Sequence, residues 1–186
     1  MAEKKVLLVL AEDMDWNGSG EALEQLKKKA ALLPRAESAG LADLARKMGG
    51  VEVPADAEAM KAAMSGENGL AVAHGAAALA PALEAADRRT LLLVAAGNGA
   101  ALYGMAINAK AGSVDRAVNA QDLAVTMAAI GDLPLDETYT GGIIYQVLKN
   151  PNFKRDEIKK LQEAILRMES VLERNSREPW EKHDCA

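Results

Sequence analysis

The sequence predicts an α/β protein: a three-layer α/β/α sandwich with a mainly parallel sheet, followed by a long C-terminal helix. Short apolar runs alternate with helical patterns along the chain, which is typical of a parallel sheet covered on both faces. The run Leu91–Ala96 is continuously apolar, as expected of a strand buried on both sides. With 186 residues, the chain is long enough for one domain with a sizeable core.

The first half of the chain is expected to contain three strands and three helices. Val6–Ala11 is an apolar run of strand length, and Glu21–Leu33 carries apolar residues at helical spacing. Gly49 and Gly50 end the second helical pattern, and Pro54 precedes the third. The predicted order is strand Val6–Ala11, helices Glu21–Leu33 and Glu37–Met48, strand Val51–Val53, helix Asp56–Met64 and strand Leu70–Ala73.

The second half of the chain continues the alternation. An alanine-rich helix, two strands, a helix and a short final helix are predicted at Ala76–Ala86, Leu91–Ala96, Leu102–Ile107, Gln121–Ile130 and Ile143–Leu148. Between the last two helices, "GDLPLDETYTGG" has the glycine, proline and polar residues of a loop. We therefore expect residues 1–150 to form the α/β domain.

Residues 151–186 differ in character and are predicted to form an amphipathic helix and a tail. In Asp156–Asn175 the apolar residues are spaced alternately by three and four, a stripe of nearly three heptads formed by Ile158, Leu161, Ile165, Met168 and Leu172. Packing on the chain's own domain would explain this stripe, and so would a homodimer or a partner protein bound through Asp156–Asn175. The tail, "SREPWEKHDCA", has no periodicity and is expected to be an extended arm.

Composition excludes several classes of function. A net charge of −5 and a pI near 5.2 argue against nucleic-acid binding, which needs a basic surface. No apolar stretch has the length that would span a bilayer, so no membrane insertion is expected. Cys185 is the only cysteine, which favours a reducing cytoplasm and leaves a lone thiol that could pair between molecules.

The loop "DMDWNGSGEALE", residues 13–24, fits the pattern of a calcium-binding loop. In that interpretation Asp13, Asp15, Asn17 and Glu24 supply oxygen ligands, and Gly18 makes the sharp turn. A simpler interpretation is that Asn17 or Ser19 caps the next helix, whose first turns hold the acidic residues. A third interpretation is a residual single-metal site that includes Glu12 or Asp13 at the end of the first strand.

From Thr90 onward the order of elements resembles the C-terminal half of the alkaline phosphatase superfamily. That superfamily includes sulfatases, type I phosphodiesterases and cofactor-independent phosphoglycerate mutases. The resemblance covers about residues 68–150 and rests mainly on "TLLLVAAGNG" and "DLAVTMAAIGDLP". The matching positions are Tyr103-Gly104, Asp122, Thr126, Leu133-Pro134 and Gly142.

The resemblance implies a two-metal ester hydrolase, but the residues that this chemistry needs are missing. Gly97-Asn98 stands where the family has an Asp-His metal motif, and glycine offers no ligand atom. The family nucleophile should open the helix near Asp56, yet no Ser, Thr or Cys lies between Ser38 and Ser65. The sequence therefore favours a pseudoenzyme that acts as a binding or interaction protein.

A pocket of polar residues is still expected where the strands end, since ligands of such sheets bind beyond the carboxyl ends of the strands. His74 and Asn98 are its candidate residues, beside the acidic loop after the first strand. No cofactor follows with certainty; one divalent cation, either calcium, magnesium or zinc, is the candidate. The alternatives to a pseudoenzyme are a divergent metal-dependent phosphate- or sulfate-ester hydrolase using Asp13, Asp15 and His74, and a calcium-binding module.

Overall fold

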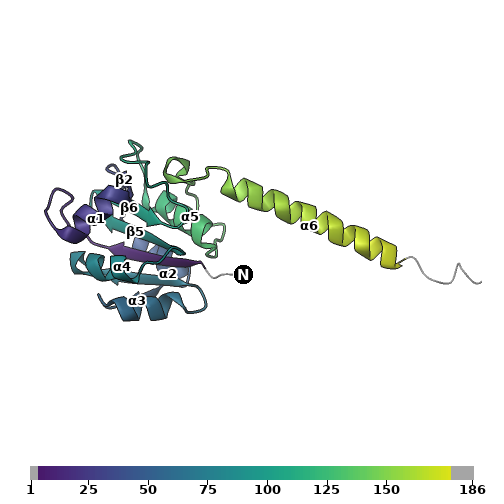
Figure 1. The fold of residues 1–186 in the computed structure, drawn as a ribbon, viewed down its shortest axis with the longest axis horizontal. Coiled ribbons are helices and arrows are strands. Elements are labelled where there is room, and N and C mark those ends of the chain that lie inside the picture. Colours follow the sequence, from purple (N-terminus) through teal and green to yellow (C-terminus); the bar gives the residue numbers. More distant parts are fainter. Residues whose placement is uncertain (1–3, 177–186) are drawn as a thin grey trace, which may run out of the picture. The chain divides into compact units, whose positions relative to one another are not determined.

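The computed structural model describes residues 4–176, which fall into two compact units that meet between Pro151 and Asn152. The first unit is an α/β domain built on one six-stranded sheet. The second contains a single long helix. The fold class predicted from the sequence is therefore confirmed, with a mainly parallel sheet and a long C-terminal helix (Figure 1).

The sheet has the strand order β2-β6-β5-β1-β4-β3, so the first strand of the chain lies near its centre. β1 pairs in parallel with both β4 and β5, and only β6 runs against the other strands. The strands are β1 (Lys5–Leu10), β2 (Ala31–Leu33), β3 (Val51–Val53), β4 (Leu70–His74), β5 (Thr90–Ala96) and β6 (Gly99–Gly104). Every residue of β5 is buried, as its continuous apolar run predicts.

Helices cover both faces of this sheet. Leu7 and Val9 of β1 face the layer formed by α1 (Glu21–Lys29), α3 (Ala57–Met64) and α4 (Leu79–Ala85). The alternate residues of β1 face the opposite side, which is covered by α5 (Ala120–Gly131). Gly131, at the end of this helix, lies so close to Val6 that a Cβ on Gly131 would overlap the Val6 side chain. α2 (Leu41–Lys47) packs next to α5 in that second layer. The core is almost entirely aliphatic, and Thr90 and Thr126 are the only buried polar residues among those described.

The β5–β6 hairpin differs from the sequence prediction. β6 begins at Gly99, directly after the two-residue turn Gly97-Asn98, whereas the predicted strand was Leu102–Ile107. Gly104 ends the strand because its φ of 95° favours glycine, and a Cβ there would overlap the carbonyl oxygen of Thr90. The start of the strand was not predicted because Gly99 and Ala100 have low strand propensity.

Two predicted helices are shorter in the structure. The helical pattern at Glu21–Leu33 ends at Lys29, and its last three residues form β2, because they pair with β6 at the edge of the sheet. The pattern at Glu37–Met48 becomes a helix only at Leu41, after Gly40 with its φ of 84°. In both places pairing or backbone geometry overrides an apolar periodicity that suits a helix.

The remaining elements agree with the predicted types, with small differences in their ends. Ala76–Ala86 divides into the 3₁₀ helix η1 (Ala76–Ala78) and α4, and the final short helix is the 3₁₀ turn η2 (Tyr145–Val147). Residues 132–144 form the predicted loop. No helix in the described part of the chain is both long enough and apolar enough to cross a membrane.

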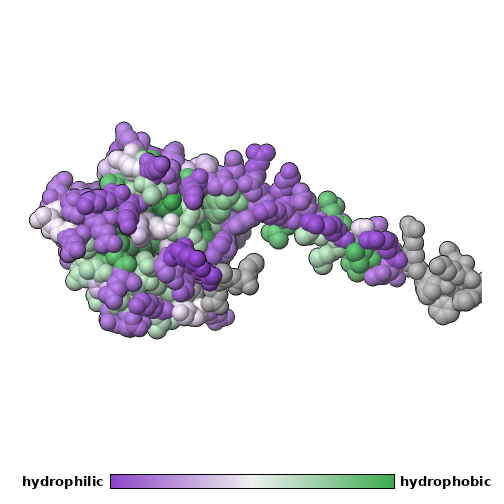
Figure 2. Space-filling model, in the orientation of Figure 1, coloured by the Kyte–Doolittle hydropathy of each residue, from purple (hydrophilic) through white to green (hydrophobic). Residues whose placement is uncertain are grey.

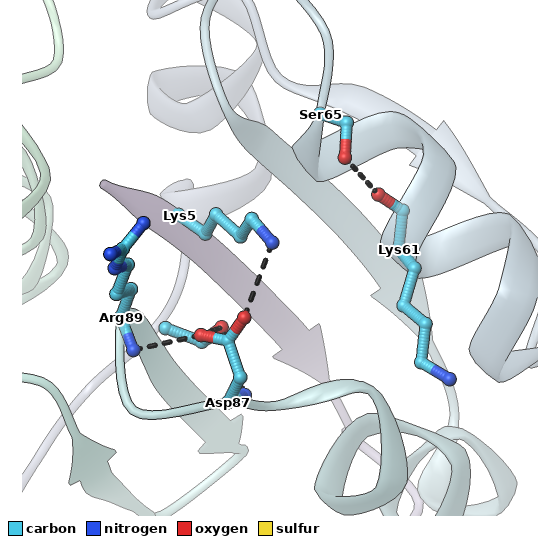
Figure 3. Close-up of polar contacts among 6 residues, drawn as sticks. Lys5, Lys61, Ser65, Asp87 and Arg89 are labelled. Atoms are coloured by element: carbon cyan, nitrogen blue, oxygen red, sulfur yellow. Dashed lines mark hydrogen bonds and ion pairs between the residues drawn. The ribbon is translucent and has the colours of Figure 1, made fainter. Parts of the chain in front are cut away.

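At the amino end of the central strands, a polar cluster joins β1 to β5. Asp87 accepts hydrogen bonds from the backbone N–H of Arg89 at 2.7 Å and from Lys5 Nζ at 3.2 Å (Figure 3). The Arg89 N–H first, and then Lys5 and Thr90, lower the pKa of the Asp87 carboxyl group. This end of the sheet is therefore closed by structural contacts, which leaves the opposite, carboxyl end for the candidate site.

The second unit contains α6 (Phe153–Ser176), a helix of 24 residues that is longer than the predicted Asp156–Asn175. None of its residues is buried, and its exposed large apolar side chains are Ile158, Leu161, Ile165, Leu166, Met168, Val171 and Leu172. Figure 2 shows green, hydrophobic side chains on this helix among purple, hydrophilic ones. The predicted extended arm after Ser176 and the lone thiol of Cys185 lie outside the described residues.

Candidate functional site at the carboxyl edge of the sheet

The carboxyl ends of β4, β1 and β5 lie side by side, because β1 pairs in parallel with both neighbours. The loops that follow these strands are residues 11–20, the segment after His74, and the turn Gly97-Asn98. The segment after β4 is bonded to the end of β1: the backbone N–H of Gly75 donates to the carbonyl oxygen of Leu10 at 2.9 Å. The topology thus brings the predicted site loops to one edge, as expected for a parallel sheet.

Asp13 is the residue of the first loop that contacts a second loop. Its Oδ1 accepts a hydrogen bond of 2.7 Å from the backbone N–H of Ala76, the first residue of η1. Gly75 supports this contact, because its φ of 85° turns the chain sharply after β4. The carboxylate of Asp13 therefore fixes the acidic loop against the start of η1 and α4.

Asp15 serves the internal geometry of the acidic loop. Its Oδ1 accepts from the backbone N–H of Asn17 at 2.9 Å, and its carbonyl oxygen accepts from Gly18 at 3.0 Å. These two bonds form an Asx turn followed by a tight backbone turn. Gly18 thus makes the sharp turn that the sequence indicated.

The capping prediction for the helix after this loop is wrong. The N-cap of α1 is Gly20, with no side-chain capping bond, so neither Asn17 nor Ser19 caps the helix. Glu21 and Glu24 do occupy its first turn, where negative charge suits the helix dipole. Glu24 lies 3.8 Å from Lys27, so an ion pair along the helix accounts for its carboxylate.

An open hollow of about 350 Å³ lies between the acidic loop and the helices beside it. Asp13, Asp15 and Ser19 supply its polar lining, and Leu23 and Leu79 are among its apolar residues. The hollow is the concave feature that contains predicted site residues. His74 and Asn98 are not among the residues that line it.

His74 belongs to a different set of contacts. Its Nε2 lies 3.6 Å from Glu52 Oε2, and the other oxygen of Glu52 accepts from Arg46 at 3.1 Å. The side chains of His74 and Glu52 are both about half exposed. A network of charged surface side chains thus links α2, β3 and β4 through Arg46, Glu52 and His74. Sequence reasoning missed Glu52 and Arg46, because only the pairing of β3 with β4 brings them to the histidine.

The third loop is too short to hold a ligand set of its own. Asn98 is exposed at the tip of the β5–β6 hairpin, and Gly97 beside it has no side chain. Trp16 packs over this hairpin, since a Cβ on Gly99 would approach its indole nitrogen within 2.6 Å. The sequence offered one signal for this contact, a lone tryptophan in a polar loop that precedes a glycine-rich turn.

The donors at this edge do not fit the two-metal centre that the resemblance implies. Asp13 and Asp15 each accept a backbone hydrogen bond, and His74 faces Glu52. Among residues 4–176, no group of three or more His, Cys, Asp or Glu side chains is arranged to hold a metal ion. A single-cation site at Glu12, Asp13, Asp15, Asn17 and Glu24 stays a prediction.

The residue near which the resemblance implies a nucleophile, Asp56, is a helix cap. Asp56 Oδ2 accepts from the backbone N–H of Ala59 at 2.8 Å and so caps α3. At the carboxyl end of β5, the hydroxyl group of Ser38 donates to the carbonyl oxygen of Ala96 at 2.9 Å. Both groups satisfy backbone partners, which is a structural role.

The positions that carry the resemblance also have structural contacts. Asp122 caps α5 together with Asn119 and accepts from the N–H of Gly142 at 2.8 Å. The hydroxyl oxygen of buried Thr126 accepts from the N–H of Ile144 at 2.9 Å. These bonds attach the loop 132–144 to α5, so these side chains have a structural role in this chain.

The structure therefore places a polar edge, an open hollow and a chain of surface charges where the sequence predicted a site. Comparisons with protein-family models, with curated proteins and with solved structures gave no match.

Proposed function

We propose that this chain is a non-catalytic α/β domain of the alkaline phosphatase type that acts as an interaction protein, with α6 as its interaction element. The observation that carries the proposal is the exposure of seven large apolar side chains along α6, each at least 46% exposed. An apolar patch of this kind marks a surface that another molecule covers.

The energetics of α6 support this role. A helix of 24 residues is stabilised mainly by packing of its apolar face, and none of its residues is buried in the chain. Full burial of one Leu, Ile or Met side chain contributes about 1.5–3 kcal/mol. Covering the α6 stripe would therefore supply enough free energy for a specific complex, after the entropy cost of association.

The carboxyl edge supports the non-catalytic part of the proposal. An ester hydrolase of the resembling family needs a nucleophile and a cluster of metal ligands in one pocket. Here the carboxylates of Asp13 and Asp15 are engaged by the backbone, and the hollow beside them contains no histidine among its lining residues. The open hollow could bind a small ligand without catalysing a reaction.

An activity assay tests the non-catalytic part. We expect purified protein to release no product from aryl phosphate, phosphodiester or sulfate esters, with magnesium, manganese, zinc or calcium added in turn. Asp13→Ala is the diagnostic variant, and Asp43→Ala, an exposed carboxylate that pairs with Arg46 on α2, is its control. Turnover that Asp13→Ala abolishes and Asp43→Ala preserves would contradict the proposal.

A further inference from the structure

The charges beside the apolar stripe of α6 identify the molecule that would cover it. With Ile158 at heptad position a, the five residues of the predicted stripe occupy positions a and d, and Ala164 and Val171 at position g widen it on one side. Leu166, at position b, lies outside this wider stripe. A stripe that includes position g is wider than a strict a/d seam and offers a broad face to a second helix.

The two halves of α6 carry opposite charge excess. Residues 153–162 contain four basic and two acidic side chains, whereas residues 163–176 contain three acidic and two basic ones. Two copies of the helix would therefore attract each other most when they run antiparallel, because the basic half of one lies beside the acidic half of the other.

Position e makes this preference specific. Arg155, Gln162 and Glu169 occupy the e positions of α6. In an antiparallel pair the e positions of the two helices face each other, so Arg155 of one copy lies opposite Glu169 of the second, and Gln162 lies opposite Gln162. In the same register Ile158 faces Met168 and Leu161 faces Ile165, so the four inner layers are apolar, and Leu172 faces Lys154 in the outermost layer at each end.

Other pairings of two copies lack this match. A parallel pair would place Glu157 beside Gln162 and Ala164 beside Glu169, and no opposite charges would meet. An antiparallel pair shifted by one heptad would place Gln162 opposite Glu169 and Arg155 opposite Ser176. The favourable pair Arg155–Glu169 forms twice by symmetry in only the first register.

We propose that α6 binds a second copy of itself, antiparallel, in the register that places Arg155 opposite Glu169. This rests on the proposed interaction role of α6 and names its partner. The interface is isologous, as in most homodimers, because the same helix face is used by both copies. In this register residues 153–173 of the two copies overlap, and at about 1.5 Å per residue these 21 residues give a contact about 31 Å long.

Charge reversal tests the register. We expect Arg155→Glu and Glu169→Arg each to weaken self-association about tenfold in sedimentation equilibrium, since each brings like charges together twice. The double variant restores it, because opposite charges meet again. Loss of helix cannot explain the effect of Arg155→Glu, because an acidic residue in the first turn favours the helix. Glu163→Arg, at the outer position f, is the control and should not change the mass.

Cysteine cross-linking tests the orientation independently, with Cys185→Ser in every chain. Gln162→Cys is expected to form a disulfide-linked dimer, because residue 162 meets its copy in the proposed register. Met168→Cys is expected to stay unlinked, because antiparallel pairing separates the two copies of residue 168 by about 15 Å along the axis, beyond disulfide reach. A cross-linked Met168→Cys dimer, or double charge variants that fail to recover, would overturn the proposal.

If the protein is a monomer at all concentrations, the proposal of self-pairing is overturned. The variant Leu161→Ala then shows whether the proposed interaction role of α6 is overturned as well. If Leu161→Ala leaves the unfolding of the monomer unchanged, the stripe serves a different partner, and only self-pairing is overturned. If Leu161→Ala destabilises the monomer, the stripe packs against its own chain, and both proposals are overturned.

Discussion

The two units of this protein use similar apolar side chains in opposite ways. In the α/β unit, Leu91, Leu92 and Leu93 are fully buried in the central strand β5. In α6, Leu161 and Leu172 have the same chemistry and are each 64% exposed. Apolar content alone therefore does not locate a core: the leucines of β5 are buried by folding of the sheet, whereas those of α6 remain exposed.

A second contrast concerns polar groups. At the carboxyl edge of the sheet, carboxylates bind backbone N–H groups, as Asp13 does with Ala76 and Asp15 does with Asn17. On α6, charged side chains flank the apolar stripe and include Arg155 and Glu169. The polar residues of the first unit hold loops in place, and those of the second flank an exposed apolar face.

The largest expected effect is a matched pair of leucine truncations. Leu93→Ala removes a fully buried side chain of β5 and should lower the free energy of unfolding of the α/β unit by about 2–5 kcal/mol. Leu161→Ala removes an exposed one and should change it by less than about 0.5 kcal/mol. Urea denaturation at a protein concentration too low for self-association measures both. Equal losses would remove the contrast between the two units.

A smaller effect is expected from a buried hydroxyl. Thr126→Val leaves the N–H of Ile144 without its acceptor and should cost about 1–3 kcal/mol in the same measurement. Thr126→Ser keeps the acceptor and separates the hydrogen bond from the shape of the side chain. Ser170→Val, on exposed α6, should change unfolding by less than about 0.5 kcal/mol. An unchanged Thr126→Val variant would mean that the loop 132–144 is not held to α5 by this bond.

The sequence could predict the sheet because its central strands are continuously apolar, as in Leu91–Ala96 and Val6–Ala11. It could not predict β2, because three residues of an apolar helical pattern become a strand only when β6 lies beside them. The start of β6 was missed for a related reason, since Gly99 and Ala100 have no local signal of strand and are placed by the hairpin.

For the candidate site, the sequence could predict only which loops lie close together. Parallel pairing of β1 with β4 and β5 brings the predicted loops to one edge, and sequence patterns are sufficient for that inference. The use of each side chain was not predictable, because it depends on which backbone N–H groups lie nearby. Asp13 reaches η1, and His74 reaches Glu52 on a strand that is 22 residues away in the sequence.

Hydrogen–deuterium exchange measured at increasing protein concentration tests the central claim most directly. We expect amides of β1 and β5 to be protected at every concentration, whereas protection of residues 158–172 of α6 should rise as the chains associate. Protection of that segment that is already complete at the lowest concentration would show that its own chain covers the stripe. That result would contradict the account.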